Sequence, residues 1–440
     1  MASGRRTLKP SWRFTFAKRI PTADPTAELP VPAPFRCPIS LELMKDPVTL
    51  RTGITYDRQS IESWLETGSL ICPVTNQALG GDELLPNHTI RRLIQDWCVA
   101  NRSFGFERIP TPRIPVTSIQ ASGLLSEIAF VGRRGDTARC QELVGKIKAL
   151  GKESERNRRC IGSAGAGRVL SACFSELAAE SFERSRAGAA EEILSALPLF
   201  FPLDQDSCRQ LSSPKSLDSV VSALTSEDLD ARVNAALVLR ELLSSLPPRR
   251  INGVAGTDGL VEALSKLIQN PISPRATKAS LVAAFYLVAS SDRAAAALAD
   301  TGIISSLLEI LVDSDKGMCE KALAVLDGVL GCSRGREMTY GHALTVAVLV
   351  KKMLRVSDMA TEFAVSALWK LCKNEKRGRG CSIEAVQVGA FQKSLLLLQV
   401  GCSGETKEKV NDLLKLLNGC RGGSLECTEE VDFRGVKRPF

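Results

Sequence analysis

The sequence predicts a mainly α-helical protein in which a small α+β domain precedes an α-helical solenoid. Aromatic residues make up only 5% of the 440 residues. Leu and Ala are abundant, as expected where helices pack through aliphatic and small side chains. From about Ser118 onward, apolar residues recur at helical spacing almost without interruption. Five similar segments follow one another at steps of 43, 43, 43 and 44 residues, a period typical of helical solenoids.

Proline-rich stretches divide the chain into domains. Five prolines between residues 21 and 34 exclude a helix or a central strand there, because proline fixes φ and lacks an amide hydrogen. A second such stretch closes the compact segment that follows. We therefore expect a basic, proline-rich, disordered leader, a compact domain, a linker, a degenerate helical region, a regular repeat array and a tail, with the bounds 1–33, 34–108, 109–117, 118–214, 215–421 and 422–440.

The compact domain is expected to contain a hairpin and two helices. Short extended runs at 46–50 and 54–56 flank Thr52-Gly53, where glycine supplies the unusual backbone angle of the turn. Asp57 stands where a helix N-cap belongs, and Gly68 follows as the stop. A final helix should begin after Asn87, with an apolar face made of Ile90, Leu93, Ile94, Trp97 and Cys98.

A domain of about seventy residues often needs metal or disulfide staples. Its soft ligands are few, widely spaced and without a C-x-x-C pair, whereas two structural zinc ions would need eight ligands. We therefore expect neither a metal nor a cofactor. Polar side chains must then fix the loops, and the candidates for this network are Glu42, Asp57, Arg58, Thr75 and Asn87.

Composition excludes several function classes. The formal net charge is +8, but six basic residues precede the first acidic one, and the large helical region does not read as a polyanion binder. Apolar runs such as Ala343–Val350 fall short of the ~18–20 residues that span a bilayer. Fourteen cysteines without a secretory signal predict reduced thiols. His88 and His342, the two histidines, lie far apart, so we expect no catalytic residue.

The compact segment resembles a U-box, the metal-free relative of the RING domain. The resemblance rests on Phe35-Arg36-Cys37-Pro38-Ile39-Ser40-Leu41-Glu42-Leu43-Met44, Asp46-Pro47-Val48, Gly53-Ile54-Thr55-Tyr56-Asp57-Arg58, Ile61-Glu62-Ser63-Trp64-Leu65, Cys72-Pro73-Val74-Thr75 and Pro86-Asn87. It implies a domain that binds a ubiquitin-conjugating enzyme already charged with ubiquitin and holds the ubiquitin ready for attack. Such a domain contributes orientation rather than covalent chemistry.

The same resemblance implies which residues contact the conjugating enzyme: Ile39, Leu41, Trp64, Pro73 and Asn76. Ile39 and Pro73 are expected on two loops that converge on one shallow apolar groove, largely outside the core. Trp64 fits the core as well as it fits the groove, so both roles stay open. Asn76 falls where some family members carry a cation, and its missing charge bears on the strength of activation.

The repeated segments resemble armadillo repeats. They begin at Ser216, Gly259, Gly302, Thr345 and Gly389, and each continues into a second apolar helix that starts with a small residue or valine. A degenerate earlier repeat is expected around residues 157–177. The order of a U-box and then armadillo repeats resembles the plant U-box/armadillo ubiquitin ligases. This implies a plant source, a concave groove for a target and a role in stress responses.

We therefore expect a RING-type ubiquitin-protein ligase that works in the cytoplasm, with the nucleus as a second compartment. Its expected partners are the charged conjugating enzyme and a protein substrate in the armadillo groove, with a homodimer through the U-box left open. Neither a nucleic acid nor a membrane span is expected. The competing hypothesis is a non-enzymatic armadillo scaffold whose U-box only mediates association.

Overall fold

The structure, a computed structural model, describes residues 30–67, 69, 71–79, 84–109, 115–179, 184–375 and 380–421. The chain forms two compact units, Met1–Ile114 and Pro115–Phe440. Nearly all of the expected leader, residues 110–114 of the expected linker and the expected tail 422–440 lie outside the described residues. Each unit is treated by itself below.

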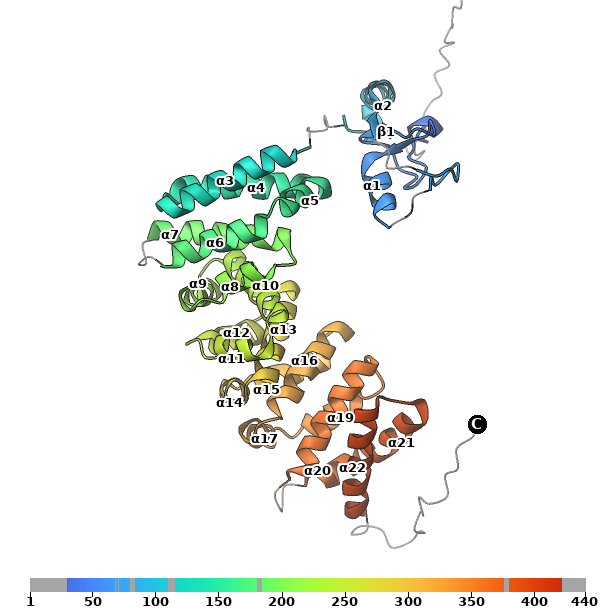
Figure 1. Cartoon of the computed structure of the whole chain (residues 1–440). Helices are drawn as coiled ribbons and strands as arrows, with labels where there is room; N and C mark the ends of the chain where they lie inside the picture. The colour runs from blue at the N-terminus through green and yellow to red at the C-terminus, as the bar shows by residue number, and fades with distance from the viewer. Residues whose placement is uncertain are drawn as a thin grey trace, which may run out of the picture. The chain divides into compact units, whose positions relative to one another are not determined.

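The N-terminal unit is the predicted small α+β domain (Figure 1). A three-stranded antiparallel sheet has the order β2-β1-β3, with Val48 opposite both Tyr56 and Pro86. The hairpin turn contains Gly53 at φ 77°, as expected, whereas the third strand was not predicted. The elements are η1 (Ala33–Phe35), β1 (Pro47–Thr49), β2 (Thr55–Asp57), α1 (Arg58–Glu66), β3 (Leu85–Pro86), α2 (His88–Ala100) and η2 (Arg102–Phe104).

Two local predictions in this unit need correction. Asp57 is the N-cap residue of α1 but makes no side-chain cap bond, because its carboxylate binds a neighbouring loop instead. Leu93 was placed on the buried face of α2, yet it is 51% exposed while Ile94 and Cys98 are fully buried. The predicted Asn87 cap is present: its Oδ1 accepts a hydrogen bond from the Ile90 amide at 3.0 Å. Gly68 lies outside the described residues.

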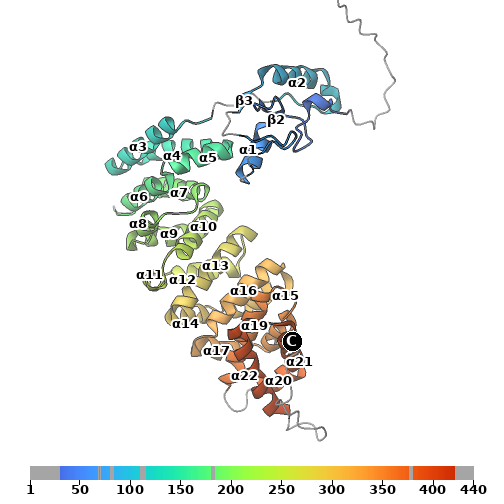
Figure 2. The same ribbon diagram turned by 45° about the vertical axis from the view of Figure 1, so that its right-hand side comes forward.

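The second unit is a solenoid of helices stacked in chain order (Figures 1 and 2). A helix pair opens it, and three-helix repeats follow, each with its third helix packed against the third helix of the next repeat. The pair is α3 (Ser118–Arg134) and α4 (Thr137–Glu153), and the repeats are α5 (Glu155–Ser163), α6 (Ala166–Ala179) and α7 (Arg184–Ala196); α8 (Gln205–Leu211), α9 (Pro214–Thr225) and α10 (Leu229–Ser245); α11 (Pro248–Val254), α12 (Leu260–Gln269) and α13 (Pro274–Ser290); α14 (Asp292–Asp300), α15 (Ile303–Asp313) and α16 (Lys316–Val329); α17 (Ser333–Thr339), α18 (Thr345–Lys352) and α19 (Asp358–Lys373); and α20 (Cys381–Gln387), α21 (Ala390–Val400) and α22 (Gly404–Arg421). A short 3-10 helix, η3 (Leu197–Phe200), follows α7.

Sequence signals explain why the repeats break where they do. Gly259, Gly302 and Gly389, the aligned glycines of the repeat, precede the second helices α12, α15 and α21 with φ between 73° and 87°. Only glycine adopts this left-handed backbone without strain. Many of the third helices start at side-chain caps, such as Ser273 before α13 and Asp315 before α16. In the irregular early region Gly165, with φ 93°, precedes α6 in the same way.

One continuous hydrophobic core runs through the described part of the array. The aligned small residues Ala235, Ala279, Ala322 and Ala364 of the third helices are 0–1% exposed, which lets neighbouring helices approach closely. Among the described residues no single helix is long and apolar enough to cross a membrane, and the α14–α15 pair that meets the length and composition criteria is bent by 83°.

Candidate functional site

Two loops of the N-terminal unit have the same structure. In the first, the Cys37 amide donates to the Glu42 carbonyl at 2.8 Å and the Leu41 amide to the Cys37 carbonyl at 2.8 Å. In the second, the Cys72 amide donates to the Gln77 carbonyl at 2.8 Å and the Asn76 amide to the Cys72 carbonyl at 2.9 Å. The sequences Cys-Pro-Ile-Ser-Leu-Glu and Cys-Pro-Val-Thr-Asn-Gln therefore build one loop twice, each closed by an isolated bridge.

Each loop contains a non-glycine residue with a left-handed backbone. Leu41 has φ 59° and Asn76 has φ 55°. Asn tolerates this conformation better than most residues, whereas a leucine there is strained. Leu41 is also 70% exposed. The hydrogen bond from the Leu41 amide to the Cys37 carbonyl helps hold this backbone, and the apolar side chain stays on the surface.

Both loops are fixed to adjacent residues of β2. The Asp57 amide donates to Cys37 Sγ at 3.3 Å, and the Tyr56 hydroxyl lies 3.1 Å from Cys72 Sγ. The Thr52 hydroxyl adds a weaker contact to Cys72 at 3.5 Å. Both sulfurs are fully buried. The cysteine side chains thus anchor the loops through hydrogen bonds.

The environment of Cys72 favours its thiolate. Burial opposes ionisation, but the polar groups of Thr75, Tyr56 and Thr52 that face the sulfur outweigh it and lower the pKa of Cys72 to about 6. Burial and the adjacent Cys72 raise the pKa of Tyr56 well above its ordinary range. Tyr56 is therefore the donor in the contact between the two side chains. A charge-assisted hydrogen bond of this kind is stronger than one between neutral groups.

Three of the five residues predicted for the polar network make several bonds in the structure. Asp57 Oδ1 accepts from the Lys45 and Asp46 amides at 2.7 and 2.8 Å. Arg58 Nε donates to Asp46 Oδ2 at 2.6 Å. Asn87 Nδ2 donates to the hydroxyls of Thr49 and Thr55 at 3.1 and 3.3 Å, joining α2 to both strands of the hairpin.

The other two predicted network residues lie elsewhere. The Glu42 side chain is exposed, and its backbone closes the first loop. The Thr75 hydroxyl is buried near Cys72 without a hydrogen bond of normal geometry among the described residues. Sequence reasoning also missed Asp46, the acceptor for Arg58. The adjacent Asp46-Pro47 pair at the start of a strand was the available signal.

The residues expected to contact the conjugating enzyme differ in burial. Leu41 and Asn76 are exposed, whereas Ile39, Trp64 and Pro73 are half-buried. Ile39 and Trp64 pack against the core of the unit, so Ile39 is less separate from the core than the sequence suggested. Trp64 Nε1 donates to the Ile71 carbonyl at 2.9 Å, which links α1 to the second loop.

Val74 is a surface residue that sequence reasoning did not name. It occupies the position in the second loop that Ile39 occupies in the first, and it is 50% exposed. Ile71, which precedes the same loop, is 47% exposed. The repeated Cys-Pro-aliphatic sequence was the signal that pointed to it. Apolar atoms are therefore presented by both loops.

The third helices α10, α13, α16 and α19 lie along the inward-curving side of the array (Figure 1). Phe285 of α13 and Phe363 of α19 contact each other with ring centroids 6.0 Å apart, although α16 lies between their helices in chain order. Closer to the N-terminal end, α4, α7 and α10 surround a hollow of about 430 Å³. Its lining includes side chains of both charges together with Gln141 and Asn234.

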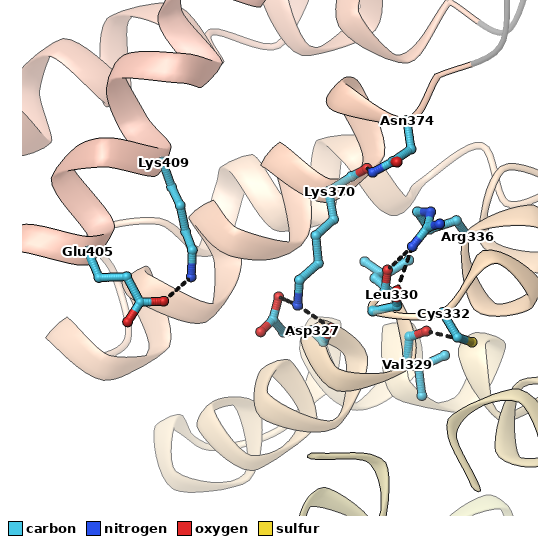
Figure 3. A network of polar contacts seen from close by, with 10 residues as sticks. Asp327, Val329, Leu330, Cys332, Arg336, Lys370, Asn374, Glu405 and Lys409 are labelled. Carbon is cyan, nitrogen blue, oxygen red and sulfur yellow. Dashed lines mark hydrogen bonds and ion pairs between the residues drawn. The ribbon is translucent and has the colours of Figure 1, made fainter. Parts of the chain in front are cut away.

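Polar bonds near the C-terminal end of the array lie both between neighbouring repeats and within one helix (Figure 3). Lys370 of α19 donates to Asp327 of α16 through both the side-chain oxygen, at 2.7 Å, and the carbonyl, at 2.8 Å. On α22, Lys409 pairs with Glu405 at 2.7 Å. Arg336 of α17 caps the end of α16 by donating to the Leu330 and Gly331 carbonyls. The bonds of Lys370 and Arg336 link neighbouring repeats, whereas the pair of Lys409 and Glu405 lies within α22.

Among the described residues, no three His, Cys, Asp or Glu side chains group as metal ligands. The two paired loops instead use hydrogen bonds to sulfur.

Comparisons with known proteins match both units. Residues 31–103 match the family "U-box domain", and residues 120–429 match "Plant U-box protein ARM repeat region". "U-box domain-containing protein 21" of Arabidopsis thaliana is 41% identical over 437 residues, covering 99% of each chain. "E3 ubiquitin-protein ligase PUB23" of Arabidopsis thaliana is 34% identical over 405 residues, covering 88% of this chain and 93% of the relative.

Solved structures match the described helices at low identity. An engineered protein shares 18% identity over 68% of each chain with a TM-score of 0.50, a likeness that concerns the fold alone. A designed armadillo repeat protein shares 17% identity with a TM-score of 0.45, over 56% of this chain and 98% of that chain.

Proposed function

The chain belongs to the plant U-box proteins with an ARM repeat region, and on that premise we propose that its U-box recruits a ubiquitin-charged conjugating enzyme while its repeats bind the target. Relatives named as E3 ubiquitin-protein ligases match over 88% of this chain. The protein is thus a ubiquitin-protein ligase of the RING type, without a covalent catalytic residue. In our proposal ubiquitin passes directly to a lysine of the target.

The paired loops are the observation that carries this proposal. They present the apolar side chains of Ile39, Leu41 and Val74 on a frame fixed by Cys37 and Cys72. A rigid frame matters because the domain acts through orientation: well-aligned intramolecular reactions reach effective molarities of ~10⁵–10⁸ M. Apolar contacts on two loops with identical geometry suit a small, transient interface.

The array supports the second half of the proposal. Its inward-curving third-helix face and the hollow of about 430 Å³ offer a binding surface with hydrogen-bonding groups such as Gln141 and Asn234. Solenoids commonly bind partners through such concave faces. We also propose that the protein works in the cytoplasm, with the nucleus as a second compartment. Both compartments keep thiols reduced, which suits the free cysteines of the chain.

A non-enzymatic scaffold is the alternative, and an autoubiquitination time course with several conjugating enzymes separates the two. Leu41→Ala is the sharpest variant, because Leu41 is 70% exposed and its loss should leave the fold intact. Hot-spot contacts contribute ~2 kcal/mol or more each, so we expect activity to fall by roughly thirtyfold or more. Ile39→Ala should lose as much activity but also lower the melting temperature, because Ile39 packs on the core.

Leu93→Ala is the matched control. Leu93 is 51% exposed on α2 and lies outside both loops. Its variant should keep full activity. If folded Leu41→Ala and Ile39→Ala were as active as the wild-type protein, the proposed docking surface would be wrong, and absence of activity with every conjugating enzyme would favour the scaffold.

A further inference from the structure

Two thiols touch each other inside the N-terminal end of the array. Cys140 Sγ of α4 lies 3.5 Å from Cys173 Sγ of α6, and the two residues are 0% and 1% exposed. Sulfurs at this distance are in van der Waals contact. Neither cysteine has a role in the proposed ligase function, and both belong to the array rather than to the U-box.

The packing around this pair is shaped to hold the second sulfur. Gly132 of α3 faces Cys173, and a Cβ at this glycine would lie only 2.5 Å from Cys173 Sγ. Any larger residue would displace that sulfur. The helices α3, α4 and α6 therefore meet at the two thiols. Gly132 of α3 has no side chain and so leaves the space that the Cys173 sulfur occupies.

The two thiols differ in reactivity. The hydrogen bond from Cys173 lowers the pKa of Cys140, and the same contact, together with burial, raises the pKa of Cys173. Cys140 also lies in the first turn of α4, where the helix dipole favours a thiolate. Asp136 and Glu176 are the nearby acidic groups and oppose ionisation.

We propose that Cys140 and Cys173 form a redox modification site that hydrogen peroxide converts into an intramolecular disulfide. The Cys140 thiolate attacks peroxide, the O–O bond breaks, and sulfenic acid forms with release of one water after protonation. The Cys173 thiol then displaces the second oxygen as water. In sum, two thiols and one peroxide give one disulfide and two waters. The sulfurs must approach by about 1.5 Å to reach the ~2.05 Å bond length.

The disulfide would staple α4 to α6. Cross-linking residues 33 positions apart removes freedom from the unfolded chain and so favours the folded array. Because α4 contributes Gln141, Lys148 and Lys152 to the lining of the 430 Å³ hollow, the staple fixes one wall of that hollow. The cross-link would therefore act on the array, to which our proposed function assigns target binding, and it involves no residue of the U-box.

The test uses the full-length protein and hydrogen peroxide. The protein is incubated with peroxide at several urea concentrations below its unfolding transition, so that local opening admits the oxidant to buried thiols. The oxidant is then removed, free thiols are alkylated, and peptides are mapped by mass spectrometry. We expect a Cys140–Cys173 linked peptide, a gain of a few degrees in the array's melting temperature, and reversal of both by dithiothreitol.

Cys173→Ser and Cys140→Ser should abolish both the linked peptide and the stabilisation. Cys208→Ser, which removes another buried thiol, is the matched control and should retain them. Two outcomes would overturn the proposal: alkylation of Cys140 and Cys173 as separate thiols at every urea concentration, or peroxide products of Cys140 that never include Cys173. A disulfide confined to Cys372, Cys381 and Cys420, which lie near one another at the C-terminal end of the array, would also overturn it.

Discussion

The U-box and the armadillo array hold their shapes in opposite ways. In the U-box a small core is surrounded by loops that a few hydrogen-bonded side chains hold in place. We call these side chains hubs, and they include Asp57, Asn87, Cys37 and Cys72. In the array one apolar core runs through repeat after repeat, and individual polar bonds such as Lys370 to Asp327 only adjust the spacing. Loss of a hub should therefore affect a whole U-box, whereas the array should share the loss of one bond among many contacts.

Removing a hub of the U-box should have the largest effect. Asp57→Ala leaves the Lys45 and Asp46 amides without their acceptor. Two lost charge-assisted hydrogen bonds should cost about 2–4 kcal/mol, a large share of a small domain's stability. Calorimetry of the full chain should show a lower unfolding temperature for the U-box and an unchanged one for the array. The autoubiquitination rate should fall.

Glu42→Ala is the control for this hub, because Glu42 is exposed. We expect it to melt like the wild-type protein. Equal losses in the two variants would show that Asp57 is not a hub.

A clash placed between repeats should have the next largest effect. A Cβ at Gly335 of α17 would lie 2.8 Å from the Val329 carbonyl carbon and closer still to its oxygen. Gly335→Ala should therefore destabilise the array by about 1–3 kcal/mol. Gly253→Ala on α11, where nothing lies within 4 Å, should be neutral or stabilise by up to ~1 kcal/mol. Urea unfolding midpoints of the two variants are then compared. Similar midpoints would contradict the close approach of Gly335 to the Val329 carbonyl.

The stability of the U-box should also depend on pH through Cys72. Because the pKa of Cys72 is lowered to about 6 in the folded state, the unfolded chain binds more protons above that pH, and stability rises with pH. The contribution is lost as pH falls through about 6. Between pH 6 and 7.5 the gain should be about 1.6 kcal/mol, at 1.36 kcal/mol per pKa unit and with the folded thiol half protonated at pH 6.

Cys72→Ser checks this sign, because a hydroxyl does not ionise in the range. Calorimetry of the wild-type U-box transition at pH 5.5, 6.5 and 7.5 should show the rise, and the variant should flatten it. A wild-type transition independent of pH would mean that Cys72 stays protonated.

The smallest effect is expected from a single inter-repeat ion pair. Lys370→Met removes the contacts to Asp327. The side chains of Lys370 and Asp327 are 20% and 15% exposed. We expect a loss of about 1 kcal/mol or less, measured by urea unfolding of the array. A loss as large as that of Asp57→Ala would remove the difference between the two units.

The sequence determined the order of the two units, their fold classes and most helix positions, because periodicity and turn residues are local properties. The 43-residue step found the helices that stand second in each repeat, and the aligned Gly259, Gly302 and Gly389 proved to be left-handed residues that precede them. The second apolar helices expected from the sequence are the third helices of the structure, and the short first helices were not predicted. The hairpin around Gly53 and the Asn87 cap followed in the same way. The irregular α7 was not predicted as a third helix, because its apolar spacing is less regular.

Contacts between distant residues were decided only by the tertiary structure. Asp57 was predicted as a helix cap, but its carboxylate accepts hydrogen bonds from the Lys45 and Asp46 amides. No local sequence pattern indicates a partner eleven residues away. Burial of Ile39 against the core and the meeting of Cys140 with Cys173 depend on how whole elements pack. Local backbone preference is written along the chain, whereas contacts between side chains arise only when separate elements are brought together.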